Sequence, residues 1–213
     1  MTQQESLSQA MADLAEEKVK VLIKEKIAAG VPATQILKEC QAGMAEVGNR
    51  YEEEKYFVSE LMYAGEIMKD IMADLGPMLS GEQESEATLG KVVLGTVKGD
   101  IHDLGKDVVA LMLRGAGFDV IDLGVDVPPE KFVAAVKESG AKIVGMSVFL
   151  TMAYEAATAT VKAIRKAGLR DKVSIMIGGG PVTDLVREKT GCDFYGKDAV
   201  AGTNYALEVV GAK

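Results

Sequence analysis

The chain has 213 residues, of which 48% are hydrophobic and 26% are charged, enough to bury the core of one or two globular domains. The formal net charge of −8 is opposite to the basic surplus of proteins that bind nucleic acids, so we expect no nucleic-acid partner. No apolar run is long enough to span a membrane, the N-terminus lacks the pattern of a signal peptide, and the two cysteines lack metal-ligand spacing. We therefore expect a cytoplasmic protein with no membrane partner.

The first part of the chain predicts only helices. Apolar residues recur there at steps of three and four, as at Val58, Leu61, Met62 and Met68. Short joints separate these stretches, and one of them contains Gly30 in the position of a helix C-cap. This pattern predicts a small antiparallel four-helix bundle. The predicted helices cover residues 6–14, 16–30, 32–54 and 57–76.

The pattern changes at the polar, acidic stretch 79–91, after which β-rich runs alternate with amphipathic helices. Such alternation predicts an α/β domain with a five-stranded parallel sheet covered by helices on both faces, in a flavodoxin-like (Rossmann-like) order. We expect a helical cap domain with linker over 1–89 and this sheet domain over 90–213. The predicted strands are 91–97, 118–124, 142–149, 173–179 and 193–196, and the predicted helices are 104–117, 128–140, 153–168 and 182–191.

The segment "TVKGDIHDLGKDVV", which follows the first predicted strand, does not fit a phosphate-binding loop. A P-loop that starts at Gly99 requires its second glycine where Leu104 stands, and a hydroxyl residue where Asp107 stands. The dinucleotide fingerprint of spaced glycines is missing as well. Both nucleotide interpretations are therefore poor.

The same segment contains Asp100-x-His102-x-x-Gly105 and the only histidine of the chain. On an exposed turn, the His102 imidazole can ligate a metal while Asp100 accepts a hydrogen bond from its other ring nitrogen. One histidine is too few for a zinc site, but it suits a metal whose other positions a macrocycle already fills. The alternative is an ordinary exposed histidine at the start of a helix.

Further polar and small residues follow the third and fourth predicted strands, at Ser147 and at Gly178–Gly180. In a flavodoxin-like order the switch point lies between the first and third strands, so we expect His102 and Ser147 to face one another there. The glycines leave room for a long, flat ligand. Ser147 alone has a second interpretation, as a strand-end hydroxyl that satisfies a backbone group.

Together, these motifs resemble the cobalamin-binding signature of methionine synthase and of the corrinoid proteins of methyltransferase systems. The helical half resembles the cap of that family, most clearly over residues 43–61, so the resemblance covers nearly the whole chain. Two positions depart from the family pattern. Phe149 stands where leucine is usual, and Gly180 stands where alanine is common.

The resemblance implies base-off/His-on binding of cobalamin, with His102 as the lower ligand of cobalt. It implies a cofactor that passes through methylcobalamin and the Co(I) and Co(II) states. Asp100 and Ser147 join His102 in the expected catalytic group, as a hydrogen-bonded chain that takes up a proton when the histidine leaves cobalt.

The resemblance also implies contacts to the cofactor from both halves of the chain. From the helical half, Phe57, Leu61, Met62 and Met68 are expected to form an apolar lid over the corrin, with a hinge at residues 80–89. A stripe of this kind is also typical of simple bundle core. The expected contacts of the sheet domain are Gly99, Asp100, Ile101, His102, Asp103, Gly105, Ser147, Phe149, Thr151, Gly178, Gly179, Gly180 and Ala199.

The function that the resemblance implies is a methyl carrier of anaerobic one-carbon metabolism, without turnover of its own. Its expected partners are a substrate:corrinoid methyltransferase, a corrinoid:tetrahydrofolate (or coenzyme M) methyltransferase and a reductive activating protein. Methoxylated aromatics (O-demethylation) and methylamines are both open as donors, with a slight lean to the former. The alternatives are a cobalamin-responsive regulator, the cobalamin subunit of a mutase, or a flavin- or nucleotide-binding flavodoxin-like protein, which leaves His102 and the cap unexplained.

Overall fold

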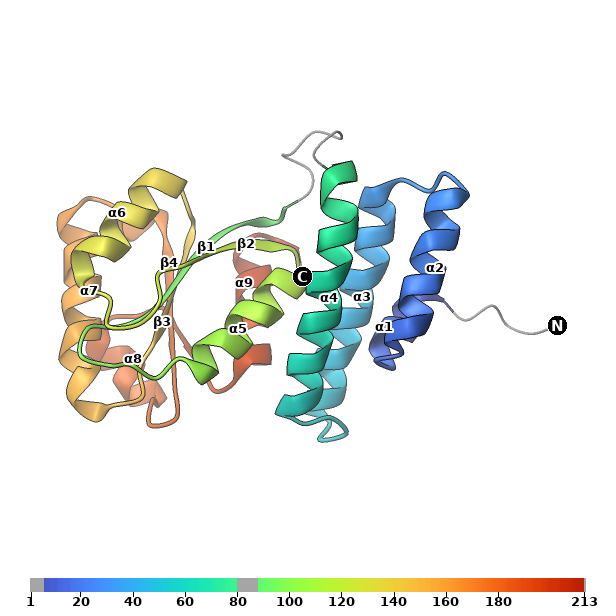
Figure 1. The fold of residues 1–213 in the computed structure, drawn as a ribbon. Coiled ribbons are helices and arrows are strands. Elements are labelled where there is room, and N and C mark those ends of the chain that lie inside the picture. Colours follow the sequence, from blue (N-terminus) through green and yellow to red (C-terminus); the bar gives the residue numbers. More distant parts are fainter. Residues whose placement is uncertain (1–5, 80–87, 213) are drawn as a thin grey trace. The chain divides into compact units, whose positions relative to one another are not determined.

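The computed structural model of the chain describes residues 6–79 and 88–212, which divide into two compact units (Figure 1). One unit consists of the N-terminal helices together with Arg114–Gly117, and the other contains the sheet. The hinge expected at residues 80–89 lies outside the described residues except for Thr88 and Leu89.

Within residues 6–79, the helical unit forms four helices, as the sequence predicts. Helix α3 packs against both α1 and α4, while α1 also packs against α2. The closest approach is at Gly43 of α3, where an added Cβ would lie 2.5 Å from Cβ of Met11 and 2.7 Å from the carbonyl oxygen of Ser8. Glycine is therefore required for α1 and α3 to pack this closely. The bounds are α1 Leu7–Ala12, α2 Glu16–Ala28, α3 Ala33–Glu52 and α4 Val58–Leu79.

Helix α4 runs past the end that the sequence predicts. We expected it to stop at Gly76, but it continues through Pro77 to Leu79. The reason is burial: Leu75 and Leu79 are one turn apart and both are buried, so the last turn extends the apolar stripe of the helix. A proline near the end of the helix removes a single N–H donor, which this burial outweighs.

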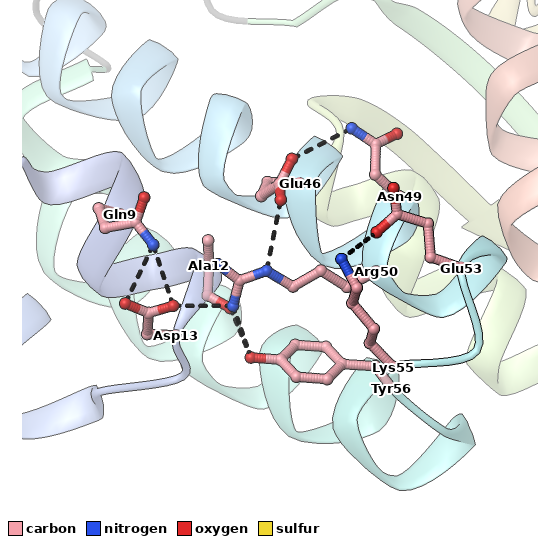
Figure 2. Close-up of polar contacts among 9 residues, drawn as sticks. All are labelled: Gln9, Ala12, Asp13, Glu46, Asn49, Arg50, Glu53, Lys55 and Tyr56. Carbon is pink, nitrogen blue, oxygen red and sulfur yellow. Dashed lines mark hydrogen bonds and ion pairs between the residues drawn. The ribbon is translucent and has the colours of Figure 1, made fainter.

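A polar cluster around Arg50 ties the end of α1 to the end of α3 (Figure 2). The Nη1 group of Arg50 donates to the carbonyl oxygen of Ala12 at 2.8 Å, to Oδ1 of Asp13 at 2.7 Å and to the hydroxyl of Tyr56 at 2.8 Å. Tyr56 in turn donates to the same Ala12 carbonyl at 2.8 Å, and Nε of Arg50 donates to Glu46 at 3.3 Å. The guanidinium thus serves acceptors from three segments of the chain.

We expect Arg50→Lys to lower the free energy of unfolding by about 1–2 kcal/mol, because an ammonium group cannot reach the Ala12 carbonyl, Asp13 and Glu46 together. Urea denaturation of the purified protein measures this loss. Arg165→Lys, at an exposed position of the sheet unit, is the matched control and should change stability by less than about 0.5 kcal/mol. Equal losses in the two variants would contradict the role of the cluster.

In the described residues, the sheet unit has five parallel strands in the order β2-β1-β3-β4-β5. This confirms the predicted α/β sheet in its flavodoxin-like order. The register aligns the ends of neighbouring strands, because Thr96 pairs with Ser147, Ser147 with Gly178, and Gly178 with Gly196. The bounds are β1 Gly90–Thr96, β2 Phe118–Asp122, β3 Ile143–Ser147, β4 Ser174–Gly178 and β5 Phe194–Gly196.

Helices cover both faces of this sheet, with α6, α7 and α8 on one face and α5 and α9 on the other (Figure 1). Helix α9 is not among the helices predicted from the sequence. It begins after Asp198, whose side chain accepts a hydrogen bond from the Ala201 amide at 2.8 Å and so caps the helix. The bounds are α5 Leu104–Gly115, α6 Pro129–Ser139, α7 Tyr154–Lys166, α8 Asp184–Thr190 and α9 Ala199–Val209, with short 3-10 turns at Thr151–Ala153 and Arg170–Lys172.

Both cysteine thiols are buried, Cys40 in α3 and Cys192 just after α8. Burial raises the pKa of the Cys40 thiol to about 12 and that of the Cys192 thiol to about 11. Among the described residues, no helix combines the length and the apolar character needed to cross a membrane.

Candidate functional site

The residues singled out in the sheet unit lie mostly in the loops after β1, β3 and β4. The strand order places β1 beside β3, with connections leaving to opposite faces of the sheet. Open α/β sheets bind their ligands at such a switch point, at the carboxyl ends of the strands. His102, Phe149 and Gly180 come together at this edge.

Asp100 joins the loop after β1 to the loop after β3. Its carboxylate has no solvent exposure (0%) and accepts bonds with both oxygens. Oδ1 accepts from the amide and from Nδ1 of His102, at 3.1 and 2.8 Å, and Oδ2 accepts from the amides of Phe149 and Leu150, at 2.6 and 2.8 Å. Burial raises the pKa of Asp100, but these hydrogen bonds, led by that of Leu150, outweigh it and lower the pKa to about 2. The carboxylate is therefore ionised at neutral pH.

His102 is oriented by this carboxylate. An ionised carboxylate can only accept, so Nδ1 carries the proton and Nε2 of the neutral ring keeps its lone pair. The imidazole is 47% exposed, and Nε2 has no hydrogen bond within the described parts of the chain. One face of the ring lies against Phe149, with 4.3 Å between ring centroids and 32° between ring planes. The result is one imidazole nitrogen with an unshared lone pair on a half-exposed ring.

The backbone of this loop is held at several points that sequence reasoning missed. Thr96 donates from Oγ1 to the carbonyl oxygen of His102 at 2.9 Å. Asp126, which has a left-handed φ of +52°, accepts from the Gly99 amide at 2.7 Å and donates its own amide to the Asp100 carbonyl at 2.9 Å. A sequence indication of the Asp126 contacts was present in "DLGVD", the acidic loop after β2.

Lys106 lies just beyond this loop and forms ion pairs with two carboxylates. Its ammonium group is buried and lies 2.6 Å from a carboxylate oxygen of Asp107 and 2.6 Å from one of Asp122. Burial lowers the pKa of Lys106, but the hydrogen bonds to the two carboxylates outweigh it and raise the pKa, so the lysine stays charged. Lys106 is thus engaged in ion pairs with both carboxylates.

Two variants of Asp126 separate its hydrogen bond from its backbone conformation. Asp126→Asn keeps an oxygen for the Gly99 amide and tolerates the left-handed φ, so we expect a change in unfolding free energy below about 0.5 kcal/mol. Asp126→Ala loses both properties, and we expect a loss of about 1–2 kcal/mol. Urea denaturation and hydrogen exchange at the Gly99 amide measure these effects. Equal effects of the two changes would refute the assigned contact.

Ser147 ends β3, but within the described residues none of the hydrogen bonds of Asp100 goes to it. The expected chain from His102 through Asp100 to Ser147 ends instead at the amides of Phe149 and Leu150. The Ser147 carbonyl accepts from the Val97 amide at 3.2 Å, which binds β3 to the loop after β1. A buried carboxylate prefers these two converging amides because they need no side-chain ordering.

The glycines after β4 lie close to the loop after β3. The Val148 amide donates to the Gly178 carbonyl at 2.9 Å. Gly179 has a φ of +134°, and an added Cβ would lie 1.9 Å from the carbonyl oxygen of Val148. Only glycine fits there. At Gly180 an added Cβ would lie 3.1 Å from the ring of Phe149.

The other predicted contacts differ in their exposure. Ile101, Asp103 and Thr151 are exposed. Ala199, also among the expected contacts, is the buried first residue of α9, a helix that the sequence did not predict. In the helical unit, Phe57 and Met62 are exposed, whereas Leu61 and Met68 are buried on the stripe of α4 that also carries Ile71 and Leu75.

The metal-ligating side chains present fit a metal ion whose other coordination positions are already filled by a cofactor. Within the described residues no group of three or more His, Cys, Asp or Glu side chains is placed to hold a metal ion. His102 offers one oriented nitrogen, and an added Cβ at Gly99 or Gly105 would meet nothing within 4 Å, so the surface beside the imidazole is open. A corrinoid, which needs one protein nitrogen and open space beside it, fits these residues.

Comparison with known proteins likewise indicates a protein that binds a corrinoid. A family described as B12 binding domain matches residues 90–203, and a second family of the same description matches residues 3–75. Trimethylamine corrinoid protein 1 of Methanosarcina acetivorans is 39% identical, covering 89% of this chain and 88% of the relative. Dimethylamine corrinoid protein of Methanosarcina barkeri is 38% identical, covering 84% of each chain.

A solved structure extends the similarity to the fold of both units. The crystal structure of a cobalamin-binding protein from Desulfitobacterium hafniense DCB-2 has a TM-score of 0.81 and 36% identity, covering 95% of this chain and 96% of that one. The helical cap, the parallel sheet and the predicted cofactor are thereby confirmed. The chain belongs to the family of B12-binding corrinoid proteins, and its cofactor is cobalamin.

Proposed function

We propose that the chain carries a methyl group between a substrate:corrinoid methyltransferase and a corrinoid:tetrahydrofolate (or coenzyme M) methyltransferase, with reactivation by a reductive activating protein. When bound, cobalamin supplies the cobalt that accepts and releases the methyl group. The observation that carries the proposal is the oriented His102 imidazole, whose Nδ1 is 2.8 Å from Oδ1 of the ionised Asp100 and whose side chain is 47% exposed. His102 is the proposed lower ligand, in base-off/His-on binding.

The methyl donor that we propose is a methylamine. The relatives reported above are named for trimethylamine and dimethylamine, and they cover most of this chain at nearly 40% identity. These names favour methylamines over the methoxylated aromatics to which the sequence alone leaned. The methyl donor is expected to bind to the separate methyltransferase, so the carrier needs no binding site for the methylamine.

The two proposed domains have separate roles: a cap with linker covers residues 1–89, and a cofactor domain covers residues 90–213. In the cofactor domain, Asp100 keeps the proton on Nδ1 of His102 and so keeps the donor nitrogen available. In the cap, Phe57 and Met62 are exposed and remain the candidates for contact with the corrin. Leu61 is buried on the same helix as Met62 and is expected to support that surface.

The ligand assignment is tested by electron paramagnetic resonance of the Co(II) form. Protein labelled uniformly with ¹⁵N is loaded with unlabelled hydroxocobalamin, freed of excess cofactor and reduced. A protein nitrogen on cobalt changes the multiplicity of the hyperfine splitting relative to unlabelled protein, whereas the nitrogen of the cofactor's own base does not. His102→Ala should abolish the labelled splitting, while Asp119→Asn, an exposed carboxylate on β2, should retain it.

The carrier role is tested with the loaded, reduced protein and candidate methyltransferases. Trimethylamine, dimethylamine and monomethylamine are supplied in parallel with a methoxylated aromatic, and methylation of the cofactor is followed by its visible spectrum. Methylation with a methylamine supports the proposal. Failure to retain cobalamin would overturn the proposal, and methylation by the methoxylated aromatic alone would overturn the methylamine as donor. Retention without methylation by any donor would favour a cobalamin-responsive regulator or a mutase subunit.

A further inference from the structure

The ring of Phe149 is close to both His102 and Gly180. It contacts the imidazole, with ring centroids 4.3 Å apart. It also occupies the place toward which a side chain at Gly180 would point, since an added Cβ would lie 3.1 Å from its Cε2 atom. The backbone below the ring is fixed, because the Phe149 amide donates to Oδ2 of Asp100 at 2.6 Å.

The two departures from the family pattern are therefore neighbours in space. The backbone of Gly180 is outside the left-handed region, so an alanine there would meet no conformational barrier. The obstacle is the Phe149 ring alone, because 3.1 Å is closer than an ordinary carbon contact of about 3.5–4.0 Å. An alanine at position 180 would therefore require the half-exposed ring of Phe149 to shift by a few tenths of an ångström.

The His102 side chain needs a second restraint besides Asp100. Its imidazole is 47% exposed, and a single hydrogen bond at Nδ1 leaves the ring able to turn about that bond. A flat side chain against one face removes this freedom, and the tilt of 32° between the two rings is compatible with an attractive offset arrangement. A leucine at position 149 would offer no flat face.

We propose that Phe149, seated in the space left by Gly180, is a positioning residue that holds the His102 imidazole in one orientation before cobalamin binds. The part of this inference that concerns cobalt rests on the proposed function. The part that concerns the imidazole belongs to the apoprotein and can be tested without the cofactor.

The apoprotein test uses the fact that His102 is the only histidine of the chain. Protein without a histidine tag and with ¹³C,¹⁵N-labelled histidine gives one set of imidazole resonances. In the wild type, the Phe149 ring current should shift these resonances away from their positions in an unstructured peptide. Phe149→Leu should abolish most of that shift, and Phe149→Tyr should preserve it. Met152→Leu, an exposed change in the same loop, should leave it unchanged.

Gly180→Ala tests the pair as a unit. In the wild-type background the added methyl group should displace the Phe149 ring and move the His102 resonances. In the Phe149→Leu background the same change should have no effect on them, because the ring is gone. Gly76→Ala in α4, where an added Cβ meets nothing within 4 Å, is the control for a glycine-to-alanine change.

With cobalamin added, Phe149→Leu should raise the dissociation constant for hydroxocobalamin by about 2- to 10-fold, the range that the loss of an aromatic contact gives. The inference is overturned if Phe149→Leu leaves the imidazole resonances at their wild-type positions, or if Gly180→Ala moves them equally in both backgrounds. The proposed function fails in a different way, by loss of cobalamin retention in the wild type, which leaves the apoprotein result standing.

Discussion

Gly179→Ala is expected to destabilise the apoprotein by more than about 3 kcal/mol, the largest effect of any single methyl group considered. The backbone at position 179 has a φ of +134°, which side-chain-bearing residues rarely adopt, and the new Cβ would lie 1.9 Å from the Val148 carbonyl oxygen. Since Val148 follows β3 and Gly179 follows β4, relief of the clash requires these two loops to separate. A loss of this size is a large part of the roughly 5–15 kcal/mol that keeps a domain folded.

Urea denaturation of Gly179→Ala measures the loss of unfolding free energy. The same substitution at two other glycines of the chain provides the comparison. Gly178→Ala places its methyl group 3.1 Å from the Gly196 carbonyl without the unfavourable φ, so a smaller loss is expected. Gly76→Ala in α4 meets open space and should be neutral or stabilising by up to about 1 kcal/mol. Stability of Gly179→Ala within 1 kcal/mol of wild type would show that the two loops are not packed as described.

Asp100→Asn is expected to lower the unfolding free energy of the apoprotein at pH 7 by about 2–4 kcal/mol. The carboxylate is fully buried and accepts from four N–H groups, two of His102 and one each of Phe149 and Leu150. An asparagine supplies only one oxygen and points an NH₂ group at donors that need an acceptor. The control is Asp119→Asn, where the carboxylate is exposed.

The difference between wild type and Asp100→Asn should depend on pH. The pKa of Asp100 is lowered to about 2 in the folded protein, below its ordinary value of 3.8, so its ionised form contributes stability above that ordinary value. This contribution, about 2 kcal/mol, is lost as the pH falls toward 2, because both states then bind the proton. Denaturation at a series of pH values should show the two proteins converging in acid. A constant difference would contradict the ionised carboxylate.

The sequence was sufficient to predict the architecture wherever periodic burial is strong. The alternation of strands and amphipathic helices after residue 90 predicted the parallel sheet and its order, which the structure confirms. Helix α9 was missed because Gly202, Thr203 and Asn204 weaken its helical propensity. Its only local signal was Asp198 as an N-cap.

The site was predicted less completely, because its contacts join residues that are distant in sequence. The spacing of Asp100 and His102 allowed their hydrogen bond to be expected, as both lie on one turn. No pattern in the sequence indicates that Oδ2 of Asp100 meets the backbone amides of residues about 50 positions away. Backbone donors are common to nearly every residue, so only the fold selects among them.

The burial of the two thiols has a chemical consequence for a carrier of methyl groups. Thiolates are strong nucleophiles toward electrophilic carbon, and a protein that repeatedly holds an activated methyl group risks alkylating itself. Cys40 and Cys192 are the only cysteines of the chain, and with pKa values of about 12 and 11 they stay protonated at neutral pH. Packing thus keeps both thiols in their protonated, weakly nucleophilic form, so that they do not compete with the methyl acceptor.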